Sequence, residues 1–366
     1  YVSAMSFGSL GARAVEAINR GCARANALHN TGEGGIAPHH DHGAGLIWQL
    51  GTGYFGARDA DGRFSMERLL ANVATHDVKA IEVKLSQGAK PGLGGVLPGA
   101  KVTPEIAGIR GVPVGQTVLS PAAHSAFSDV DGLIDFIESI AEATGLPVGI
   151  KSAVGDLAFW RELANKMAAT QRGPDFIAID GGEGGTGAGP LVFTDHVALP
   201  FRVAISAVYP VFVEHGLHDK VVFVGSGRLG FPAQALLAMA LGCDMIALAR
   251  EPMLSIGCIQ AQKCHTGHCP TGVATQSAWL GRGLDPESKS KRLARYLTTL
   301  RKEMMQLARA CGVPHPALVT TEHFAVLDGS SSRSASEAYR YDPSWRTIDQ
   351  SELAELVALS APIESH

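Results

Sequence analysis

Five short apolar runs between residues 80 and 250 constrain the fold more than any other feature of the sequence. Each run is rich in β-branched residues and ends in a charged residue or a glycine: Ala80–Lys84, Pro147–Lys151, Phe176–Asp180, Val221–Gly225 and Met245–Arg250. Continuous apolar runs of this length are typical of parallel strands that are buried on both faces. Since parallel strands carry ligand-binding loops at their carboxyl ends, the terminal charges and glycines predict a site along one edge of the sheet.

Helical patterns alternate with these runs. Leu133–Thr144 has one apolar helical face and follows a capping-box pattern at Ser128–Asp131, and a further helix opens at Phe231-Pro232 and runs to Leu241. Leu293–Ala310 predicts a surface helix after the sheet, and Gly329–Ser336 an exposed loop. The alternation supports βα units, but it does not by itself distinguish a closed barrel from an open doubly wound sheet.

The composition excludes several classes of protein. The chain has 366 residues, of which 46% are hydrophobic and 18% charged, so it can bury a large core and is not disordered. Its net charge of -4 gives no reason to expect nucleic acid or an anionic membrane as a partner. No apolar run approaches the ~20 residues of a membrane helix. We expect a cytoplasmic protein, with a region before Tyr1 that a membrane tether could occupy.

Four segments are unusually rich in glycine. They are Asn30–Gly35, Gln87–Gly95, Asp180–Gly189 and Gly225–Gly230. One such segment is most simply a tight turn, but glycine also lets a backbone approach a ligand and direct several N–H groups at it. Because these four also carry Glu33, Lys90 and Glu183, we interpret them together as a ligand site.

The last two predicted strands suggest where a phosphate would bind. One ends in Gly225–Gly227 and the next in Ala249-Arg250. In α/β barrels the loops after the last two strands commonly bind phosphate through backbone N–H groups. Arg250 is either a ligand of such a phosphate or part of a salt bridge at the end of the sheet.

Three of the six cysteines form a local cluster. Cys258, Cys264 and Cys269 are separated by five and four residues, and Pro270 follows them. Closely spaced thiolates suit an iron–sulfur cluster or a soft metal, and zinc would take a fourth ligand from His265 or His268. Three unligated loop thiols are the remaining alternative. The other cysteines, Cys22, Cys243 and Cys311, occur singly in apolar contexts and are predicted to be core residues, so a disulfide framework is not indicated.

The motifs around these features resemble the FMN-binding synthase domain of glutamate synthase, and in particular its short stand-alone forms. They are AMSFGS at Ala4–Ser9, NTGEGG at Asn30–Gly35, KLSQGAKPGLGG at Lys84–Gly95, GGTGAGP at Gly184–Pro190 and the cysteine segment Gly257–Gln276. The resemblance covers about residues 1–276 and extends more loosely to 312. It implies a (β/α)8 barrel over residues 1–312 with an iron–sulfur loop at 257–276, followed by a C-terminal helical extension at 313–366.

The resemblance also implies roles for individual residues. Glu33, Gln87 and Lys90 would contact the substrate and act in catalysis. FMN would contact Met5, Ser6, Thr31, Lys151, Gly182, Gly184, Gly185, Gly225, Ser226, Gly227, Ala249 and Arg250. Cys258, Cys264 and Cys269 would hold a 3Fe-4S cluster. Lys151 fits its role because it ends a buried run, where a cation near the flavin favours its anionic reduced form. We expect Lys84 and Lys101 to be solvated surface charges.

The implied activity is that of an oxidoreductase acting on CH–NH2 donors, which forms L-glutamate or an N-substituted glutamate from 2-oxoglutarate and an amine. Electrons would come from ferredoxin or a reductase subunit, and we expect an oligomer and a possible amidotransferase partner. Large glutamate synthases usually have an acidic residue at the position of Leu93 and a His-Asp pair at the position of Gly182-Glu183, so the substrate pocket is expected to differ there. No glutaminase nucleophile is visible in the sequence. The alternatives are a subunit of the N-methylglutamate synthase type, a non-catalytic electron-transfer subunit, and another FMN barrel, against which the cysteines argue.

Overall fold

The computed structural model describes residues 1–185, 189–190, 192–345, 348 and 350–359. Its centre is a parallel sheet in the order β1-β2-β3-β6-β7-β8-β9. These strands span His29–Asn30, Leu46–Leu50, Val78–Lys84, Val148–Ser152, Phe176–Asp180, Val222–Ser226 and Met245–Ala247. Four of the five predicted strands are therefore confirmed to within two residues at each end. The fifth, β9, ends at Ala247, and Arg250 opens a helix instead of closing the strand.

The sheet closes on itself through the segment Tyr1–Ser3. Val2 forms parallel bridges both to His29 at the start of β1 and to Leu248 just after β9. The backbone N–H of Asn30 donates to the carbonyl of Val2 at 2.9 Å, and the N–H of Ser3 donates to the carbonyl of Leu248 at 2.7 Å. The segment thus takes the place of an eighth strand, which decides between the two predicted architectures in favour of the barrel.

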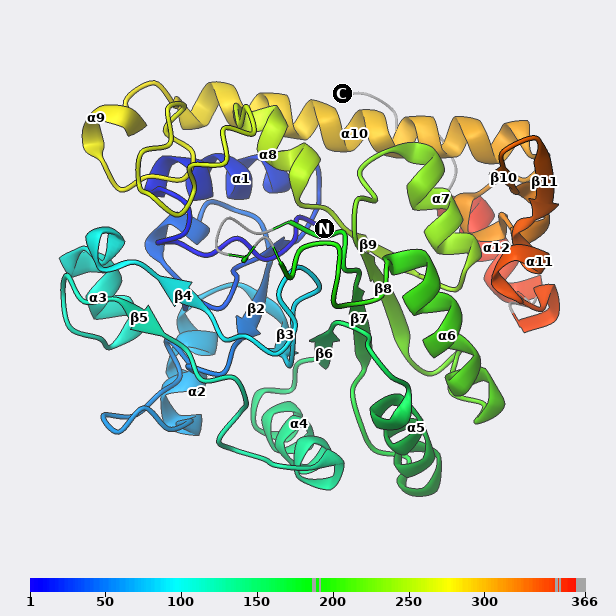
Figure 1. Ribbon diagram of the computed structural model, residues 1–366, viewed down its shortest axis with the longest axis horizontal. Coiled ribbons are helices and arrows are strands. Elements are labelled where there is room, and N and C mark those ends of the chain that lie inside the picture. The colour runs from blue at the N-terminus through cyan, green and yellow to red at the C-terminus, as the bar shows by residue number, and fades with distance from the viewer. Residues whose placement is uncertain (186–188, 191, 346–347, 349, 360–366) are drawn as a thin grey trace.

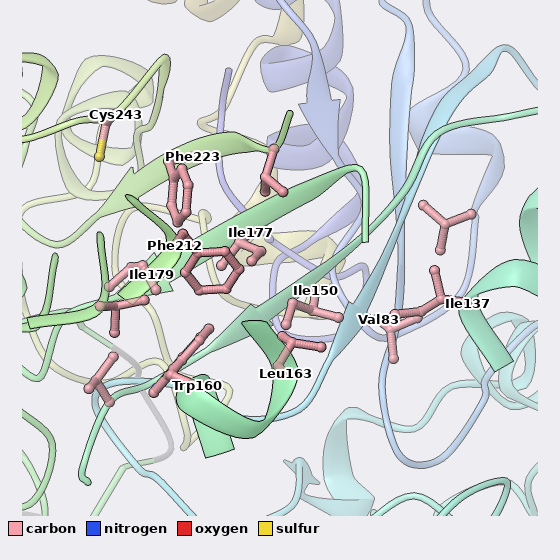
Figure 2. Close-up of a cluster of buried hydrophobic side chains, with 14 of the residues drawn as sticks. Val83, Ile137, Ile150, Trp160, Leu163, Ile177, Ile179, Phe212, Phe223 and Cys243 are labelled. Atoms are coloured by element: carbon pink, nitrogen blue, oxygen red, sulfur yellow. The ribbon is translucent and has the colours of Figure 1, made fainter. Parts of the chain in front are cut away.

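Helices cover the outside of the barrel (Figure 1). They are α1 (Ala12–Arg24), α2 (Met66–Thr75), α4 (Val130–Thr144), α5 (Ala158–Thr170), α6 (Phe201–Glu214) and α7 (Pro232–Ala240). Alternate strand residues, among them Ile150, Ile177 and Phe223, pack against apolar residues of these helices, such as Trp160 of α5 and Phe212 of α6 (Figure 2). This layer is the main core, because every side chain in it is removed from water on both the strand and the helix side.

The inside of the barrel is apolar at one end and polar toward the other. Ile47, Phe176 and Val224 belong to a small apolar cluster inside the barrel. The carboxylate of Glu82 is fully buried and accepts hydrogen bonds from the side-chain amides of Asn30, at 2.9 Å, and Gln49, at 2.6 Å. Buried polar groups are stable only when they are hydrogen-bonded, so these amides account for a carboxylate inside the barrel.

Smaller elements decorate the barrel. Between β3 and α4 lie the antiparallel strands β4 (Val96–Leu97) and β5 (Val118–Leu119), with η2 (Gly99–Lys101) and α3 (Pro104–Arg110) between them. After β9 come α8 (Arg250–Ile256), α9 (Ala278–Gly281) and α10 (Pro286–Ala310), and α10 packs along α1 (Figure 1). The remaining elements are η1 (Pro38–His40), η3 (Pro316–Leu318), η4 (Thr321–His323), β10 (Ala325–Asp328), β11 (Ser331–Ser334), α11 (Ala335–Tyr339), η5 (Pro343–Trp345) and α12 (Gln350–Leu359).

Two local predictions are wrong in detail. The cap of α4 is Asp129, whose carboxylate accepts the N–H of Gly132 at 2.8 Å, so Ser128 does not begin the helix. The predicted loop Gly329–Ser336 contains β11, which pairs with β10, and the start of α11. None of the helices in the described part of the chain is long and apolar enough to cross a membrane.

Candidate active site at the carboxyl edge of the barrel

All four glycine-rich segments lie at the same edge of the barrel. Each follows the end of a parallel strand: Asn30 ends β1, Lys84 ends β3, Asp180 ends β7 and Ser226 ends β8. Parallel strands present their carboxyl ends to one common rim, so segments that are up to 195 residues apart in sequence converge there. The structure therefore brings the four glycine-rich segments to one rim, where the residues around them form two polar clusters and a glycine-rich wall.

The first cluster is centred on Glu33. The ammonium of Lys84 donates to the Glu33 carboxylate at 3.0 Å and to the side-chain oxygen of Gln87 at 3.2 Å. Burial alone would raise the pKa of Glu33, but Lys84, Lys90 and Arg110 together hold that pKa below its usual value. Glu33 is consequently ionised. Lys84 is not the surface charge that we expected, because it forms a largely buried ion pair.

Lys90 lies in the same cluster and is almost completely buried. The residue is 4% exposed, and its ammonium donates to the carbonyl of Gly94 at 2.9 Å. Burial lowers the pKa of Lys90, Lys84 lowers it further, and Glu33 opposes the shift. An ammonium carries three donors, and the Gly94 carbonyl uses one of them, so Lys90 is suited to bind an anionic group.

Arg110, at the end of α3, completes the cluster and was not predicted. It is 4% exposed, donates from Nη2 to the carbonyl of Phe7 at 3.0 Å, and burial lowers its pKa to about 10. It lines a small polar pocket with Ser6, Glu33 and Ser120. Its Nε is buried and has no hydrogen-bond partner among the described residues. The sequence gives no signal for this role, since a basic residue in the last turn of a helix is usually a solvated end group.

The second cluster is centred on Asp180 at the end of β7. Its carboxylate accepts a hydrogen bond from the hydroxyl of Ser226 at 2.6 Å and from the backbone N–H of Gly88 at 2.9 Å. The ammonium of Lys151 lies 3.7 Å from the same carboxylate, with both side chains more than nine-tenths buried. Asp180 was not among the predicted site residues, yet it connects Lys151, Ser226 and the Gln87–Gly95 loop.

Two glycines allow the loops to approach this closely. A Cβ atom on Gly88 would lie 1.9 Å from the carbonyl oxygen of Gly181, and one on Gly94 would lie 2.0 Å from the carbonyl oxygen of Ser120. Either contact is far inside van der Waals distance, so a side chain at these positions would push the loop away from the rim. The glycines of the Gln87–Gly95 segment therefore serve close packing as well as turns.

The wall of the site near β8 and α8 brings together the predicted phosphate-binding residues. Gly225, Ser226 and Gly227 are buried, Arg250 opens α8, and a Cβ atom on Gly185 would lie 3.5 Å from the Arg250 guanidinium. The motif Gly184–Pro190 is only partly visible, because residues 186–188 lie outside the described part of the chain.

Other residues of this wall have structural partners. The N–H of Gly182 donates to the carbonyl of Leu199 at 2.9 Å. Glu183 accepts the backbone N–H of Phe201 with both carboxylate oxygens, at 3.0 and 2.8 Å, and so caps α6. Glu183 thus has a structural function that was not predicted, and its place among the charges of the ligand site receives no support from these contacts.

The segment around Met5 passes over the end of β1. Met5 is buried, and its N–H donates to the carbonyl of Asn30 at 3.5 Å, whereas Ser6 is partly exposed and lines the small pocket beside Glu33. Thr31 is fully buried, and its hydroxyl bonds to the backbone of Gly32 and Gln49. Thr31 therefore shapes the rim through backbone contacts.

The three clustered cysteines lie on the loop between α8 and α9. Burial raises the pKa of the Cys264 thiol, and the thiols of Cys258 and Cys269 raise that pKa further. The pKa of Cys269 is lowered, because hydrogen bonds from backbone N–H groups, that of Ala274 first, outweigh its burial. Within the described residues no three His, Cys, Asp or Glu side chains are arranged around a single metal ion.

The other three cysteines are dispersed. Cys22 and Cys243 are fully buried, as predicted, whereas Cys311, at the end of α10, is only partly buried. The prediction of a core position is therefore wrong for Cys311, which follows the last turn of α10 at a partly exposed position.

The cysteine loop is joined to the segment that carries Ser6. The side-chain amide of Gln276 donates to the carbonyls of Gly8, at 3.1 Å, and Leu10, at 2.9 Å. Lys101, which we expected at the surface, is 3% exposed and lies between these two segments. The cysteine loop therefore contacts the rim directly.

Comparisons with known proteins agree with this arrangement. A family described as the conserved region in glutamate synthase matches residues 1–314. The glutamate synthase large subunit-like protein YerD of Bacillus subtilis is 42% identical over 90% of this chain and 63% of its own length. An archaeal glutamate synthase [NADPH] of Methanocaldococcus jannaschii is 35% identical over 85% of this chain and 58% of its own. The chain thus spans about three fifths of the length of these two relatives.

A solved structure supports the fold independently. The flavin-binding domain of baker's yeast flavocytochrome b2 superimposes with a TM-score of 0.53 at 17% identity, over 87% of this chain and 67% of that one. At this identity the likeness concerns the barrel alone. The family match, the two relatives and the barrel all cover the part of the chain that builds the site, and the chain therefore belongs to the glutamate synthase family, as a member that contains its conserved region.

Proposed function

We propose that this chain is an FMN- and iron–sulfur-dependent oxidoreductase that forms L-glutamate, or an N-substituted glutamate, by reductive amination of 2-oxoglutarate. The observation that carries the proposal is the convergence of Glu33, Lys84, Lys90 and Arg110 beside a glycine-rich wall at the barrel rim. Three cations around one carboxylate leave a net positive charge, which favours a dicarboxylate substrate. We assign residues 1–312 to the barrel and 313–366 to a C-terminal extension.

The glycine-rich wall fits a flavin phosphate. Gly225, Ser226 and Gly227 are buried at the end of β8, and Gly185 stands opposite Arg250, so a bulky side chain would fill the space between these loops. In our proposal they hold the phosphate of FMN together with Gly182, Gly184 and Ala249, while Met5, Ser6, Thr31 and Lys151 approach the ring. The flavin-binding domain of flavocytochrome b2 has the same barrel. When bound, FMN would supply hydride.

The protein's own side chains would bind and orient the substrate. Lys90 and Arg110, both almost fully buried, would hold the two carboxylates of 2-oxoglutarate, for which the guanidinium offers a planar pair of donors. Glu33 remains ionised, so it would attract a cationic amine. Its carboxylate would accept a proton from that amine, and the neutral amine would then add through its lone pair to the keto carbon. Lys84 and Gln87 would keep the Glu33 carboxylate in place.

The electron supply follows from the cysteine loop. Cys258, Cys264 and Cys269 would hold a 3Fe-4S cluster, and the hydrogen bonds of Gln276 place their loop against the rim. We propose that a ferredoxin or a reductase subunit delivers the electrons. An amidotransferase chain would supply ammonia, and we expect the protein to be cytoplasmic and oligomeric.

Two measurements test the proposal. An anaerobic absorption spectrum with flavin and iron analysis should show bound FMN and about three irons per chain. A protein that holds zinc and no iron would contradict the cluster. Stopped-flow reoxidation of the reduced enzyme by 2-oxoglutarate should proceed with ammonia or methylamine and not with glutamine alone, because an imine forms from any amine that reaches the pocket.

The outcome of the stopped-flow measurement separates the alternatives. Faster reoxidation with methylamine than with ammonia would favour the N-methylglutamate synthase type. No reoxidation with any amine, and no change of the flavin spectrum on addition of 2-oxoglutarate, would favour a non-catalytic electron-transfer subunit.

A further inference from the structure

Lys101 has an unusual environment for a charged side chain. It ends the short helix η2, is 3% exposed, and its ammonium donates to three backbone carbonyls: Ser9 at 2.6 Å, Cys264 at 3.1 Å and Ala274 at 3.4 Å. These carbonyls belong to two segments, the one that follows Ser6 and the cysteine loop. The single ammonium therefore joins the cysteine loop to the barrel rim.

The charge of Lys101 has no carboxylate to balance it. Among the described residues no carboxylate oxygen lies within 4.0 Å of its Nζ, in contrast to Lys84 and Lys151. The ammonium lies 3.1 Å from the carbonyl oxygen of Cys264, so the charge stands directly against the cysteine loop. A buried ammonium is costly unless an anion accompanies it. The nearby groups that can become anionic are the cysteines.

We propose that Lys101 is a positioning residue that provides a fixed positive counter-charge for an iron–sulfur cluster on Cys258, Cys264 and Cys269, and raises the reduction potential of that cluster. This inference rests on the cluster in the proposed function. Lys101 also has a structural role in this proposal, because its hydrogen bonds to the carbonyls of Ser9 and Cys264 hold the middle of the cysteine loop against the segment that contains Ser9.

The direction of the effect follows from electrostatics. Reduction adds one negative charge to a cluster, and a cation that is held nearby in a medium of low dielectric constant stabilises that charge. Water screens an exposed cation far more strongly. Lys263 makes this comparison possible within the same loop, since it directly precedes Cys264 in sequence but is exposed.

The experiment compares Lys101→Met, Lys101→Arg and the control Lys263→Met with the wild-type protein. Each is purified anaerobically, and iron content, flavin content and the midpoint potential of the cluster, from a dye-mediated titration followed by electron paramagnetic resonance, are measured. Lys101→Met should lower the potential, whereas Lys101→Arg and Lys263→Met should remain near the wild-type value. Loss of iron from Lys101→Met alone would also support a role of the charge, because arginine preserves it.

Other results would overturn the inference in distinguishable ways. A wild-type protein that contains flavin but no iron would refute the proposed cluster, and with it the role of Lys101. An unchanged potential in Lys101→Met, with iron retained, would refute the counter-charge alone. Equal loss of iron from the methionine and arginine variants would show that the shape of the lysine, and not its charge, holds the loop.

Discussion

Replacing Asp180 with asparagine should destabilise the barrel severely, because it removes the counter-charge of a buried lysine. The carboxylate accepts from Ser226 at 2.6 Å and from Gly88 at 2.9 Å, and Lys151 lies 3.7 Å away. Asparagine fills the same volume and retains one acceptor oxygen, so packing hardly changes. It carries no charge, however, and its NH2 group faces at least one of these donors.

The expected cost follows from the burial of the pair. The Lys151 and Asp180 side chains are 8% and 7% exposed, so the ammonium left in Asp180→Asn has little access to water. Removing one partner of a buried ion pair typically costs about 3–5 kcal/mol, most of it from the unpaired charge. Removing both partners avoids that charge, so Lys151→Met should partly rescue the stability of Asp180→Asn.

Urea unfolding of the flavin-free protein measures these effects without a contribution from ligand binding. The fluorescence of the buried Trp48 and Trp160 reports the transition. A double-mutant cycle of Lys151→Met, Asp180→Asn and the double variant isolates the coupling. The reasoning is refuted if Asp180→Asn loses less than about 1 kcal/mol, or if the double variant is less stable than Asp180→Asn itself.

Three further predictions concern single residues. Lys90→Ala should weaken 2-oxoglutarate binding by about 1.5–3 kcal/mol, the value of a hydrogen bond to a charged group, while FMN stays bound; a spectral titration with unchanged affinity would place Lys90 outside the pocket. Cys264→Ser should abolish the iron–sulfur cluster but preserve the circular dichroism of the barrel, and unchanged iron content would contradict the ligand assignment. Glu183→Ala should cost about 0.5–2 kcal/mol in thermal unfolding, because α6 loses its cap, whereas the exposed Asp195→Ala should cost much less.

The sequence predicts the parts of the fold that depend on local pattern. β7 has the predicted bounds, Phe176–Asp180, because its continuous apolar run is buried on both faces. β1 contains only two residues, and Tyr1–Ser3 pairs through isolated bridges, so neither offers a pattern to detect. β2 contains Gln49, a polar residue that interrupts the apolar run of the strand. Its side-chain amide is hydrogen-bonded to Glu82 inside the barrel, a partner that the local sequence does not reveal.

In the candidate site, too, the features that are local in sequence were predicted and those that depend on distant residues were not. The cysteine spacing and the glycine-rich segments are local in sequence, and the comparisons confirm the family that they indicated. The environments of Lys84 and Lys101 depend on Glu33 and Cys264, which are 51 and 163 residues away in sequence. Local sequence does not contain these contacts, so both lysines were predicted to be solvated. Arg110 and Asp180 were missed for the same reason.

The closure of the barrel has a consequence for synthesis of the protein. Val2 pairs on one side with His29 and on the other with Leu248, about 250 residues further along the chain. At roughly 5–20 residues per second, a ribosome needs about 12–50 s to reach Leu248 after it has made Val2. During that interval the free edge of Tyr1–Ser3 stands exposed in the nascent chain and can pair with other strands. We therefore expect nascent chains that end before β9 to depend on chaperones, and chains that include β9 to fold with barrel closure as a late, slow step.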